Sequence, residues 1–277
     1  GLILMIFAIC KYNKHSLLND IYPLNVFNNI YLAINRACLS NNYKELSRNF
    51  TFSASTKRAG TTEVHVMVIG ETARACNWGI YGYTRNTTPN LASTKGVIAF
   101  SDVLTQSNTT HKSVPMLLSA ANADNYESVY RQKSILTAFK EAGFYTMFIS
   151  NQRPNHSLID FFGMEADTCV FLKEKNPRTE YYDIDLLKHV KAAIRSDHNK
   201  LFIVLHSYGS HYNYNERYEK NKGIYLPDNL CEAKYENKEY LMNAYDNTII
   251  YTDEFLSLLI NTLESLNTLS SLLYVSD

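Results

Sequence analysis

The sequence has no excess of either charge, because 27 lysine and arginine residues balance 27 aspartate and glutamate residues. A neutral chain generates no overall field that would attract nucleic acid, so no nucleic-acid partner is expected. Internal repeats and low-complexity segments are also absent. Hydrophobic residues make up 45% of the chain and charged residues 19%. This composition argues against disorder and suffices for the core of one large α/β domain or two small ones.

The cysteines are few and widely scattered. They form no Cys-x-x-Cys pair, which excludes the usual spacing of a structural zinc site and a dense disulfide framework. The odd number leaves at least one thiol free or in an intermolecular bond. The five cysteines are Cys10, Cys38, Cys76, Cys169 and Cys231.

The sequence also lacks an apolar run of the roughly 20 residues that a membrane-spanning helix needs. Residues 1–10 are apolar and Lys11 follows them, but no basic region precedes them as in a signal peptide. We interpret this segment as the tail of a transmembrane helix whose beginning is missing; a buried core helix is the alternative. Residues 272–277 have a strand pattern with no helix after them. Both ends are therefore expected to be cut, and the chain to be a fragment.

The distribution of apolar and polar residues along the sequence divides the chain into two regions. Residues 1–57 are predicted to be the end of a membrane anchor plus an amphipathic linker region, and residues 58–277 a main domain that is incomplete at its C-terminus. A Thr-, Ser- and Ala-rich stretch at 51–62 is typical of a linker. Helical spacing of apolar residues predicts a short amphipathic helix before it. These residues are Leu24, Phe27, Ile30, Tyr31 and Ile34.

Strand and helix patterns alternate from Glu63 onward. Such alternation predicts a three-layer α/β/α sandwich with a largely parallel central sheet. The predicted strands are 64–70, 97–103, 144–150, 201–206 and 271–276, and the predicted helices are 133–142, 183–195 and 239–265.

Polar side chains follow three of the predicted strands. Residues 64–69 are an unbroken apolar run, and Gly70 then permits a turn that presents Glu71. His206 and His211 follow the fourth strand, and Asp277 follows the last. Because parallel strands end at one edge of a sheet, these residues could converge there as a zinc or manganese site. Alternatively, Glu71 only caps the next helix, and His206 is structural.

A hydroxyl-rich turn before an apolar helix contains Thr110, with helix-compatible residues from Ser113 onward. Thr110 would lie near the helix amino end, where free N–H groups and the helix dipole favour an anion such as phosphate. A threonine hydroxyl becomes a nucleophile only when a metal or base helps it to lose its proton. The alternative is a simple N-cap. Nearby Lys112 could contact a phosphate or be an ordinary solvated charge.

Taken together, the motifs resemble the catalytic domain of bacterial phosphoethanolamine transferases, including lipid A-modifying and colistin-resistance enzymes of the alkaline phosphatase and sulfatase superfamily. The resemblance covers roughly residues 63–277 and keeps the family's motif order. It rests on Ile-Gly-Glu-Thr-Ala-Arg at 69–74, Tyr-Gly-Tyr-Thr-Arg-Asn-Thr-Thr-Pro-Asn-Leu at 81–91, Thr110 before Ser-Val-Pro, Leu-His-x-x-Gly-Ser-His at 205–211, residues 245–253, and the closing Tyr-Val-Ser-Asp.

The resemblance implies an alkaline phosphatase-like fold for the sulfatase-like domain at 58–277 and gives roles to its residues. Glu71 and Asp277 become zinc ligands, and Thr110 both ligand and nucleophile. The family's fourth ligand is a His directly after that Asp, so the site is expected to be incomplete in this chain. His211 matches a family His near the transferred phosphate, in a second-metal or acid/base role.

The resemblance also implies a head-group site at the end of the strand before Asn151 and Gln152. The lipid A enzymes carry a lysine in this region; the local sequence here departs from that pattern, and His156 is the candidate substitute. The family's cysteine framework is poorly matched, so its disulfides are not carried over.

The implied function is transfer of phosphoethanolamine from phosphatidylethanolamine to lipid A or lipopolysaccharide core. Zinc would lower the pKa of the Thr110 hydroxyl, and a covalent phospho-threonine would form. The implied location is the bacterial inner membrane, with the catalytic domain facing the periplasm. Alternatives are a phosphoglycerol transferase, a phosphodiesterase or sulfatase-type hydrolase of the same superfamily, and an inactive fragment.

Overall fold

The computed structural model describes residues 21–58, 60–175, 180–229 and 232–277. The chain separates into two compact units, residues 1–49 and 50–277. The described part of the first contains helices α2 (Leu24–Asn41) and α3 (Tyr43–Leu46). The predicted amphipathic helix is therefore present, and its apolar residues Phe27, Ile30 and Ile34 are exposed. None of the described helices combines the length and apolar character needed to cross a membrane. The predicted membrane tail at 1–10 lies outside the described residues.

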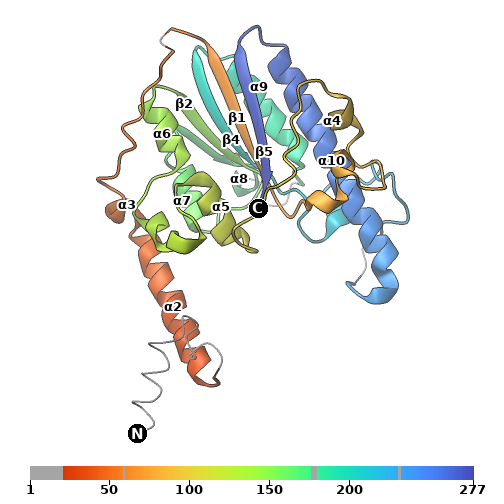
Figure 1. The fold of residues 1–277 in the computed structure, drawn as a ribbon, viewed down its shortest axis with the longest axis horizontal. Coiled ribbons are helices and arrows are strands. Elements are labelled where there is room, and N and C mark those ends of the chain that lie inside the picture. Colours follow the sequence, from red (N-terminus) through yellow and green to blue (C-terminus); the bar gives the residue numbers. More distant parts are fainter. Residues whose placement is uncertain (1–20, 59, 176–179, 230–231) are drawn as a thin grey trace. The chain divides into compact units, whose positions relative to one another are not determined.

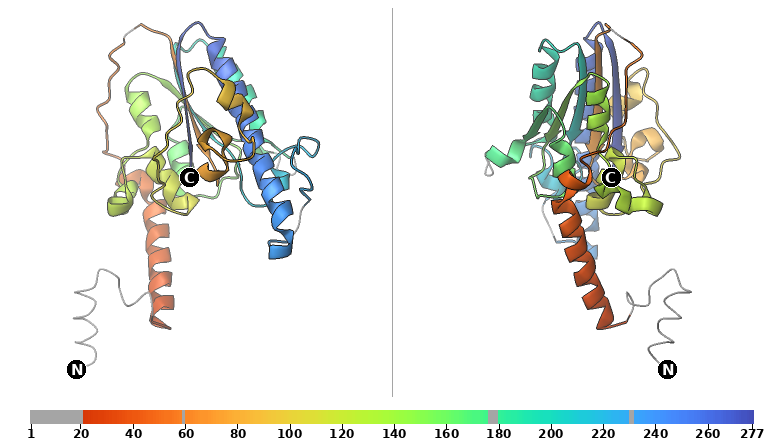
Figure 2. Two further views of the ribbon diagram at one scale, coloured as in Figure 1. Left: turned by 45° about the vertical axis from the view of Figure 1, so that its right-hand side comes forward. Right: turned by 90° about the vertical axis from the view of Figure 1, so that its left-hand side faces the viewer.

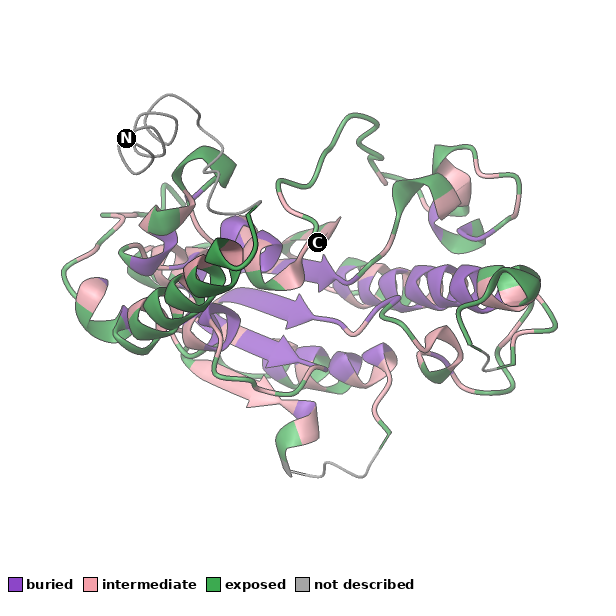
Figure 3. Ribbon diagram, turned by 90° about the horizontal axis from the view of Figure 1, so that it is seen from below, coloured by how far each residue is buried: buried purple, intermediate pink, exposed green. Residues whose placement is uncertain are grey.

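The second unit is built on a five-stranded sheet in the order β3-β2-β4-β1-β5, in which every neighbouring pair is parallel (Figure 1). This confirms the predicted parallel α/β sheet. The strands are β1 (Glu63–Gly70), β2 (Tyr145–Ser150), β3 (Thr168–Phe171), β4 (Lys200–His206) and β5 (Leu269–Ser276). The central strands β1 and β4 are the most buried, and the edge strand β3 is only partly buried (Figure 3).

Helices cover both faces of the sheet and make the predicted three layers (Figure 1). The α-helices of this unit are α4 (Pro89–Ser93), α5 (Thr110–Leu118), α6 (Ile135–Glu141), α7 (Leu158–Gly163), α8 (Leu172–Lys175), α9 (Leu186–Ile194) and α10 (Lys238–Glu264). Short 3₁₀ helices lie between them: η2 (Ala75–Asn77), η3 (Gly79–Tyr81), η4 (Ala123–Tyr130), η5 (Asp183–Asp185), η6 (Tyr214–Glu216) and η7 (Tyr235–Asn237).

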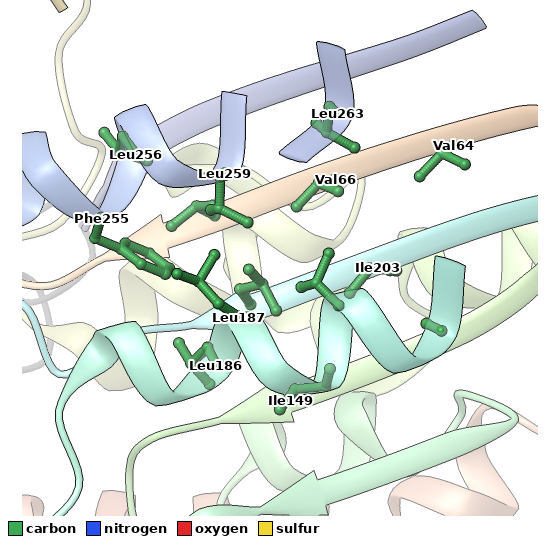
Figure 4. Packing of buried hydrophobic residues seen from close by; sticks show 14 of the residues in the cluster. Val64, Val66, Ile149, Leu186, Leu187, Ile203, Phe255, Leu256, Leu259 and Leu263 are labelled. Atoms are coloured by element: carbon green, nitrogen blue, oxygen red, sulfur yellow. The ribbon is translucent and has the colours of Figure 1, made fainter. Parts of the chain in front are cut away.

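One face packs against α9 and α10 (Figure 4). Leu259 of α10 and Leu187 of α9 are buried with Val66 and Ile203 of the sheet. Full burial of each such side chain contributes roughly 2 kcal/mol. On the other face, Phe139 of α6 stacks on Phe202 with ring centroids 3.8 Å apart. The apolar residues on both sides explain why β4 reads as a continuous hydrophobic run.

Two local features of the structure differ from the expectations. Residues 97–103 are not a strand: among the described residues nothing pairs with their backbone, and Ile98 and Phe100 are exposed. Strand β3 was not predicted because its four residues are too few to show a periodic pattern. The helix after the hydroxyl-rich turn begins at Thr110, which confirms that this residue lies at the helix amino end.

Candidate active site

The register of the sheet brings distant residues to one level. Gly70 of β1 lies opposite Ser276 of β5, so Glu71 and Asp277 emerge side by side. The amino end of α5 reaches the same point: the three views in Figures 1 and 2 all keep the chain end beside this helix. The carboxyl ends of parallel strands therefore supply the acidic residues, and a helix start supplies the hydroxyl, as is usual for sites in α/β folds.

Thr110 is the centre of this cluster. Its Oγ1 lies 2.5 Å from Asp277 Oδ2, 3.1 Å from Glu71 Oε1 and 3.3 Å from Glu71 Oε2. It is the first residue of α5, and extended Thr109 is the N-cap. Free N–H groups and the helix dipole at this end favour negative charge on the Thr110 oxygen or on a phosphate bound to it.

A strained turn holds the two carboxylates in place. Thr72 has a φ of 54°, which is unusual for a β-branched residue. Its N–H donates to Asp277 Oδ1 at 2.8 Å and its hydroxyl donates to Glu71 Oε1 at 3.0 Å. The Tyr245 hydroxyl donates to the Thr72 carbonyl at 2.7 Å. The left-handed residue of the turn is thus Thr72, not Gly70; Gly70 is needed because any Cβ there would collide with the Tyr274 hydroxyl.

The loops after β2 and β4 complete the surroundings of Glu71, which is 4% exposed. The amide of Gln152 donates to Glu71 Oε2 at 3.3 Å and to the Ser207 carbonyl at 2.9 Å. The Ser210 N–H donates to the Glu71 carbonyl at 2.8 Å. Gly209 has a φ of 46°, and a Cβ there would lie 2.7 Å from the Glu71 carbonyl oxygen.

Burial, and then the negative charge of Asp277, raise the pKa of Glu71. Hydrogen bonds from Thr72, Thr110 and Gln152 oppose that rise in pKa. The Thr110 hydroxyl has one proton, so it cannot donate to all three carboxylate oxygens that lie within 3.3 Å of it. Two carboxylates and a hydroxyl crowded together form a set of oxygens that suits a metal ion.

The three oxygen donors fit part of a divalent-cation site. Oxygen ligands about 2.0 Å from a tetrahedral zinc lie about 3.3 Å apart. The Thr110–Glu71 separations match this value, whereas Thr110 and Asp277 lie at the hydrogen-bond distance of 2.5 Å. Within the described ranges no three His, Cys, Asp or Glu side chains gather where they could hold a metal. Glu71, Asp277 and Thr110 could supply three oxygen donors to a divalent cation, and such donors suit zinc or manganese.

His206 is buried beneath the site rather than exposed in it. Its Nδ1 lies 3.2 Å from the Ser150 hydroxyl, and its Nε2 is buried without a hydrogen-bond partner among the described residues. Burial lowers its pKa to about 4, and the nearby Asp277 charge only partly offsets this. His206 is therefore a neutral residue of the interior at physiological pH, in keeping with the structural reading of the sequence.

Four other predicted residues make no direct side-chain contact with the Thr110 cluster. Asn151 is 1% exposed, and its amide donates to Asp183 Oδ1 at 2.8 Å. His211 is exposed and stacks on the Tyr208 ring at 5.2 Å. His156 is exposed, with a φ of 59°. Lys112 is half-buried, and among the described residues its ammonium has no hydrogen-bond or ion-pair partner.

Sequence reasoning missed two residues that support the site, Tyr245 and Asp183. Tyr245 lies in one of the motif runs, but nothing in the sequence indicates that its hydroxyl holds the Thr72 turn. Asp183 lies in the short 3₁₀ helix η5 and accepts hydrogen bonds from the loops after β2 and β4. In the sequence, Asp183 shows only as an Asp that precedes a predicted helix. Many N-cap residues fit the same pattern, so it does not single out a residue that supports the site.

Comparison with known proteins places this site in a family. The sequence model of the sulfatase family matches residues 64–277. Phosphatidylethanolamine transferase Mcr-1 of Escherichia coli is 32% identical over 228 residues, covering 76% of this chain and 42% of Mcr-1. The chain spans about two fifths of the length of the curated relatives it matches.

Two solved structures share the fold at 26–27% identity. The zinc complex of the C-terminal periplasmic domain of EptC from Escherichia coli has a TM-score of 0.70 and 27% identity, covering 79% of this chain and 64% of that one. The integral membrane lipooligosaccharide phosphoethanolamine transferase A of Neisseria meningitidis has a TM-score of 0.75 and 26% identity, covering 100% of this chain and 52% of that one. The chain therefore belongs to the sulfatase family, has its alkaline phosphatase-like fold, and has phosphoethanolamine transferases among its relatives there.

Proposed function

We propose that the full-length protein transfers phosphoethanolamine from phosphatidylethanolamine to lipid A or the core of lipopolysaccharide through a covalent intermediate on Thr110. The observation that carries the proposal is the convergence of Glu71 and Asp277 on the Thr110 hydroxyl at the amino end of α5. The names of the relatives support the donor and an acceptor of the lipooligosaccharide type.

In the first step, Thr110 Oγ1 attacks the phosphorus of the donor lipid. A new O–P bond forms, and the bond between phosphorus and the diacylglycerol oxygen breaks. The hydroxyl gives up its proton, and Asp277 Oδ2, 2.5 Å away, is the proposed acceptor, as an oxygen that is not bound to a metal ion. The leaving diacylglycerol oxygen takes up a proton and departs as an alcohol. Negative charge that develops on the phosphoryl group faces the free N–H groups of α5.

In the second step, an acceptor oxygen attacks the same phosphorus and loses its proton, the bond between phosphorus and Thr110 Oγ1 breaks, and Thr110 takes up a proton to restore its hydroxyl. The reaction is therefore a double displacement with ping-pong kinetics. A bound zinc ion would be held by Glu71, Asp277 and Thr110 and would supply Lewis-acid stabilisation of the phosphoryl oxygens. The zinc complex of the related EptC domain supports this choice of metal, and manganese is the alternative.

The predicted catalytic residue His211 and the predicted substrate-binding residues are proposed to act around the transferred group. Gln152 is in contact with Glu71, so it lies closest to the reacting atoms. His211 follows the loop that packs on Glu71 and would act on the acceptor side. Lys112, in the first turn of α5, has no ion-pair partner among the described residues, and its ammonium is proposed to contact an anionic group. Asn151 and His156 are proposed to shape the head-group site through the loop after β2.

The location proposed is the inner membrane of a bacterium, with the domain facing the periplasm. The related solved structures are a periplasmic domain and an integral membrane protein. The exposed apolar residues of α2 suit a helix at a membrane surface.

The proposal is tested by donor choice. The full-length protein in detergent is given labelled phosphatidylethanolamine or labelled phosphatidylglycerol, with and without lipopolysaccharide. Diacylglycerol released from phosphatidylethanolamine, together with acceptor that gains phosphoethanolamine, is the expected result. Consumption of phosphatidylglycerol instead would identify a phosphoglycerol transferase. Free phosphoethanolamine formed at the same rate without acceptor would identify a hydrolase.

A further inference from the structure

Asp183 is a buried carboxylate that joins two loops of the site. It begins η5 and is 6% exposed. Its Oδ1 accepts hydrogen bonds from the Asn151 amide and from the Tyr208 N–H, both at 2.8 Å, and its Oδ2 accepts one from the Gly209 N–H at 2.8 Å. The nearby Lys173 ammonium adds a favourable charge. One side chain therefore ties the loop after β2 to the loop after β4.

Both of these loops hold Glu71. The residue after Asn151 is Gln152, whose amide bridges Glu71 Oε2 and the Ser207 carbonyl. Gly209 packs against the Glu71 backbone, and the Ser210 N–H donates to the Glu71 carbonyl. In the described part of the chain, Asp183 forms no hydrogen bond with Glu71 or Thr110, so its influence on them passes through the two loops.

We propose that Asp183 is a positioning residue that locks the loops after β2 and β4 together and thereby holds the Glu71 carboxylate at Thr110. The inference rests on the proposed function only in that Glu71 and Thr110 are taken as the reacting site. Without the carboxylate, three buried donors lose their acceptor, and Gly209 and Gln152 are free to move. Mutation of a group that orients a metal ligand without binding the metal itself typically lowers metal affinity or activity about 10–100-fold.

The chain offers a matched control in Asp253 of α10. Asp253 is fully buried and also accepts hydrogen bonds from two backbone N–H groups and one Asn amide, those of Asn90 and Leu91. It ties α4 to α10, and among the described residues it forms no hydrogen bond with the loops that hold Glu71. Asp183→Asn and Asp253→Asn therefore place an amide against the same kinds of donors in two different parts of the fold.

The experiment compares both variants in the full-length protein, well below their melting temperatures. For Asp183→Asn we expect kcat to fall at least 10-fold with the KM for the donor lipid within twofold of wild type, and zinc affinity, measured by chelator competition, to fall about 10-fold or more. Hydrogen exchange should rise in residues 150–153 and 207–211. For Asp253→Asn, exchange should rise around residues 88–92, with kcat and zinc affinity unchanged.

Equal losses of kcat in the two variants, or unchanged exchange at 207–211 in Asp183→Asn, would overturn the positioning role. If wild type itself transfers nothing, the proposed function fails while the exchange and zinc measurements still decide the role of Asp183. In that case, loosened loops with weakened zinc binding support the role, and unaltered loops or zinc binding reject it.

Discussion

Thr110 and Asp277 are 167 residues apart in the sequence, and their side-chain oxygens lie 2.5 Å apart. The contact exists because β5 pairs with β1 in parallel and ends level with it, beside the amino end of α5. A residue at a strand end and a residue at a helix start thus meet at the sheet edge where α/β proteins bind ligands. The account of the site rests on this convergence.

The close approach of Gly209 to Glu71 predicts a large effect of a single methyl group. Gly209→Ala adds a Cβ 2.7 Å from the Glu71 carbonyl oxygen and 2.8 Å from its nitrogen, so Glu71 must shift. We expect kcat to fall about 100-fold, since misplacement by about 1 Å has effects of that size. Steady-state kinetics of the full-length variant checks this.

Gly143→Ala is its control. Gly143 also has a positive φ, 83°, but a Cβ there would meet nothing within 4 Å. Both variants carry the backbone strain of an alanine at positive φ, about 1 kcal/mol. We therefore expect similar losses of stability in the two variants but a loss of activity only in Gly209→Ala. Equal activities in the two variants would contradict the importance of the close contact between Gly209 and Glu71.

The two acidic residues predict where metal binds. Glu71→Gln and Asp277→Asn each remove the charge of a proposed zinc ligand, so we expect both full-length variants to lose zinc on dialysis and to lose about 100-fold or more in activity. Glu63→Gln is the control, because Glu63 lies at the other end of β1 and pairs with Lys200 at 2.8 Å. Elemental analysis should find wild-type zinc in Glu63→Gln; zinc retained in both site variants would refute the ligand assignment.

The sequence predicts the parallel sheet well but predicts the contacts around Glu71 poorly. Apolar runs such as 64–69 and 201–205 predict buried parallel strands, and a strand followed at once by Glu71 or Asp277 identifies the sheet edge. Residues 97–103 have the same composition as a strand but no partner among the described residues, and pairing cannot be read from a single segment. The left-handed φ of Thr72 is imposed by contacts from Asp277 and Tyr245, which lie far away in the sequence.

Removal of the Asp246 carboxylate is expected to lower the free energy of unfolding, because this side chain is the centre of a buried charge network. Its carboxylate is 0% exposed and accepts hydrogen bonds from Asn77, Tyr83 and Arg85. Asp246→Ala leaves the Arg85 guanidinium, whose side chain is 31% exposed, without its carboxylate. We expect a loss of about 3 kcal/mol in the free energy of unfolding, measured with urea.

The surface pair of Glu254 and Lys222 is the comparison. Their side chains are 34% and 38% exposed and lie 2.7 Å apart. Glu254→Gln should cost less than about 1 kcal/mol, because water screens the pair. A similar loss for both variants would mean that burial of the carboxylate is not what makes the Asp246 network stabilising.

The lowered pKa of Lys173 predicts that the stability of the protein depends on pH. Burial, followed by the charge of Arg217, lowers its pKa to about 8 from the ordinary 10.5. The folded protein therefore holds fewer protons than the unfolded chain between these values, so the charged lysine disfavours folding most below pH 8, and the effect is relieved as pH rises toward 10.5. Lys173→Met should raise the melting temperature at pH 7 and change it little at pH 10.

After allowance for solvent screening of the half-buried ammonium, the gain at pH 7 is about 1 kcal/mol, or roughly 2–4 °C. Lys222→Met should have the opposite sign at pH 7, because Glu254 raises the pKa of Lys222. Scanning calorimetry at the two pH values measures both variants, and a Lys173→Met stabilisation that is as large at pH 10 as at pH 7 would contradict the lowered pKa.

The central claim is that Thr110 carries the transferred group, and mass spectrometry tests it most directly. Full-length protein is incubated with phosphatidylethanolamine without acceptor, digested, and the peptide that contains Thr110 is sequenced. Wild type and Thr109→Ala should carry phosphoethanolamine on Thr110, since the Thr109 hydroxyl contacts Ser107 rather than the acidic residues. Thr110→Ala should carry none. An adduct still present on that peptide in Thr110→Ala would contradict the account.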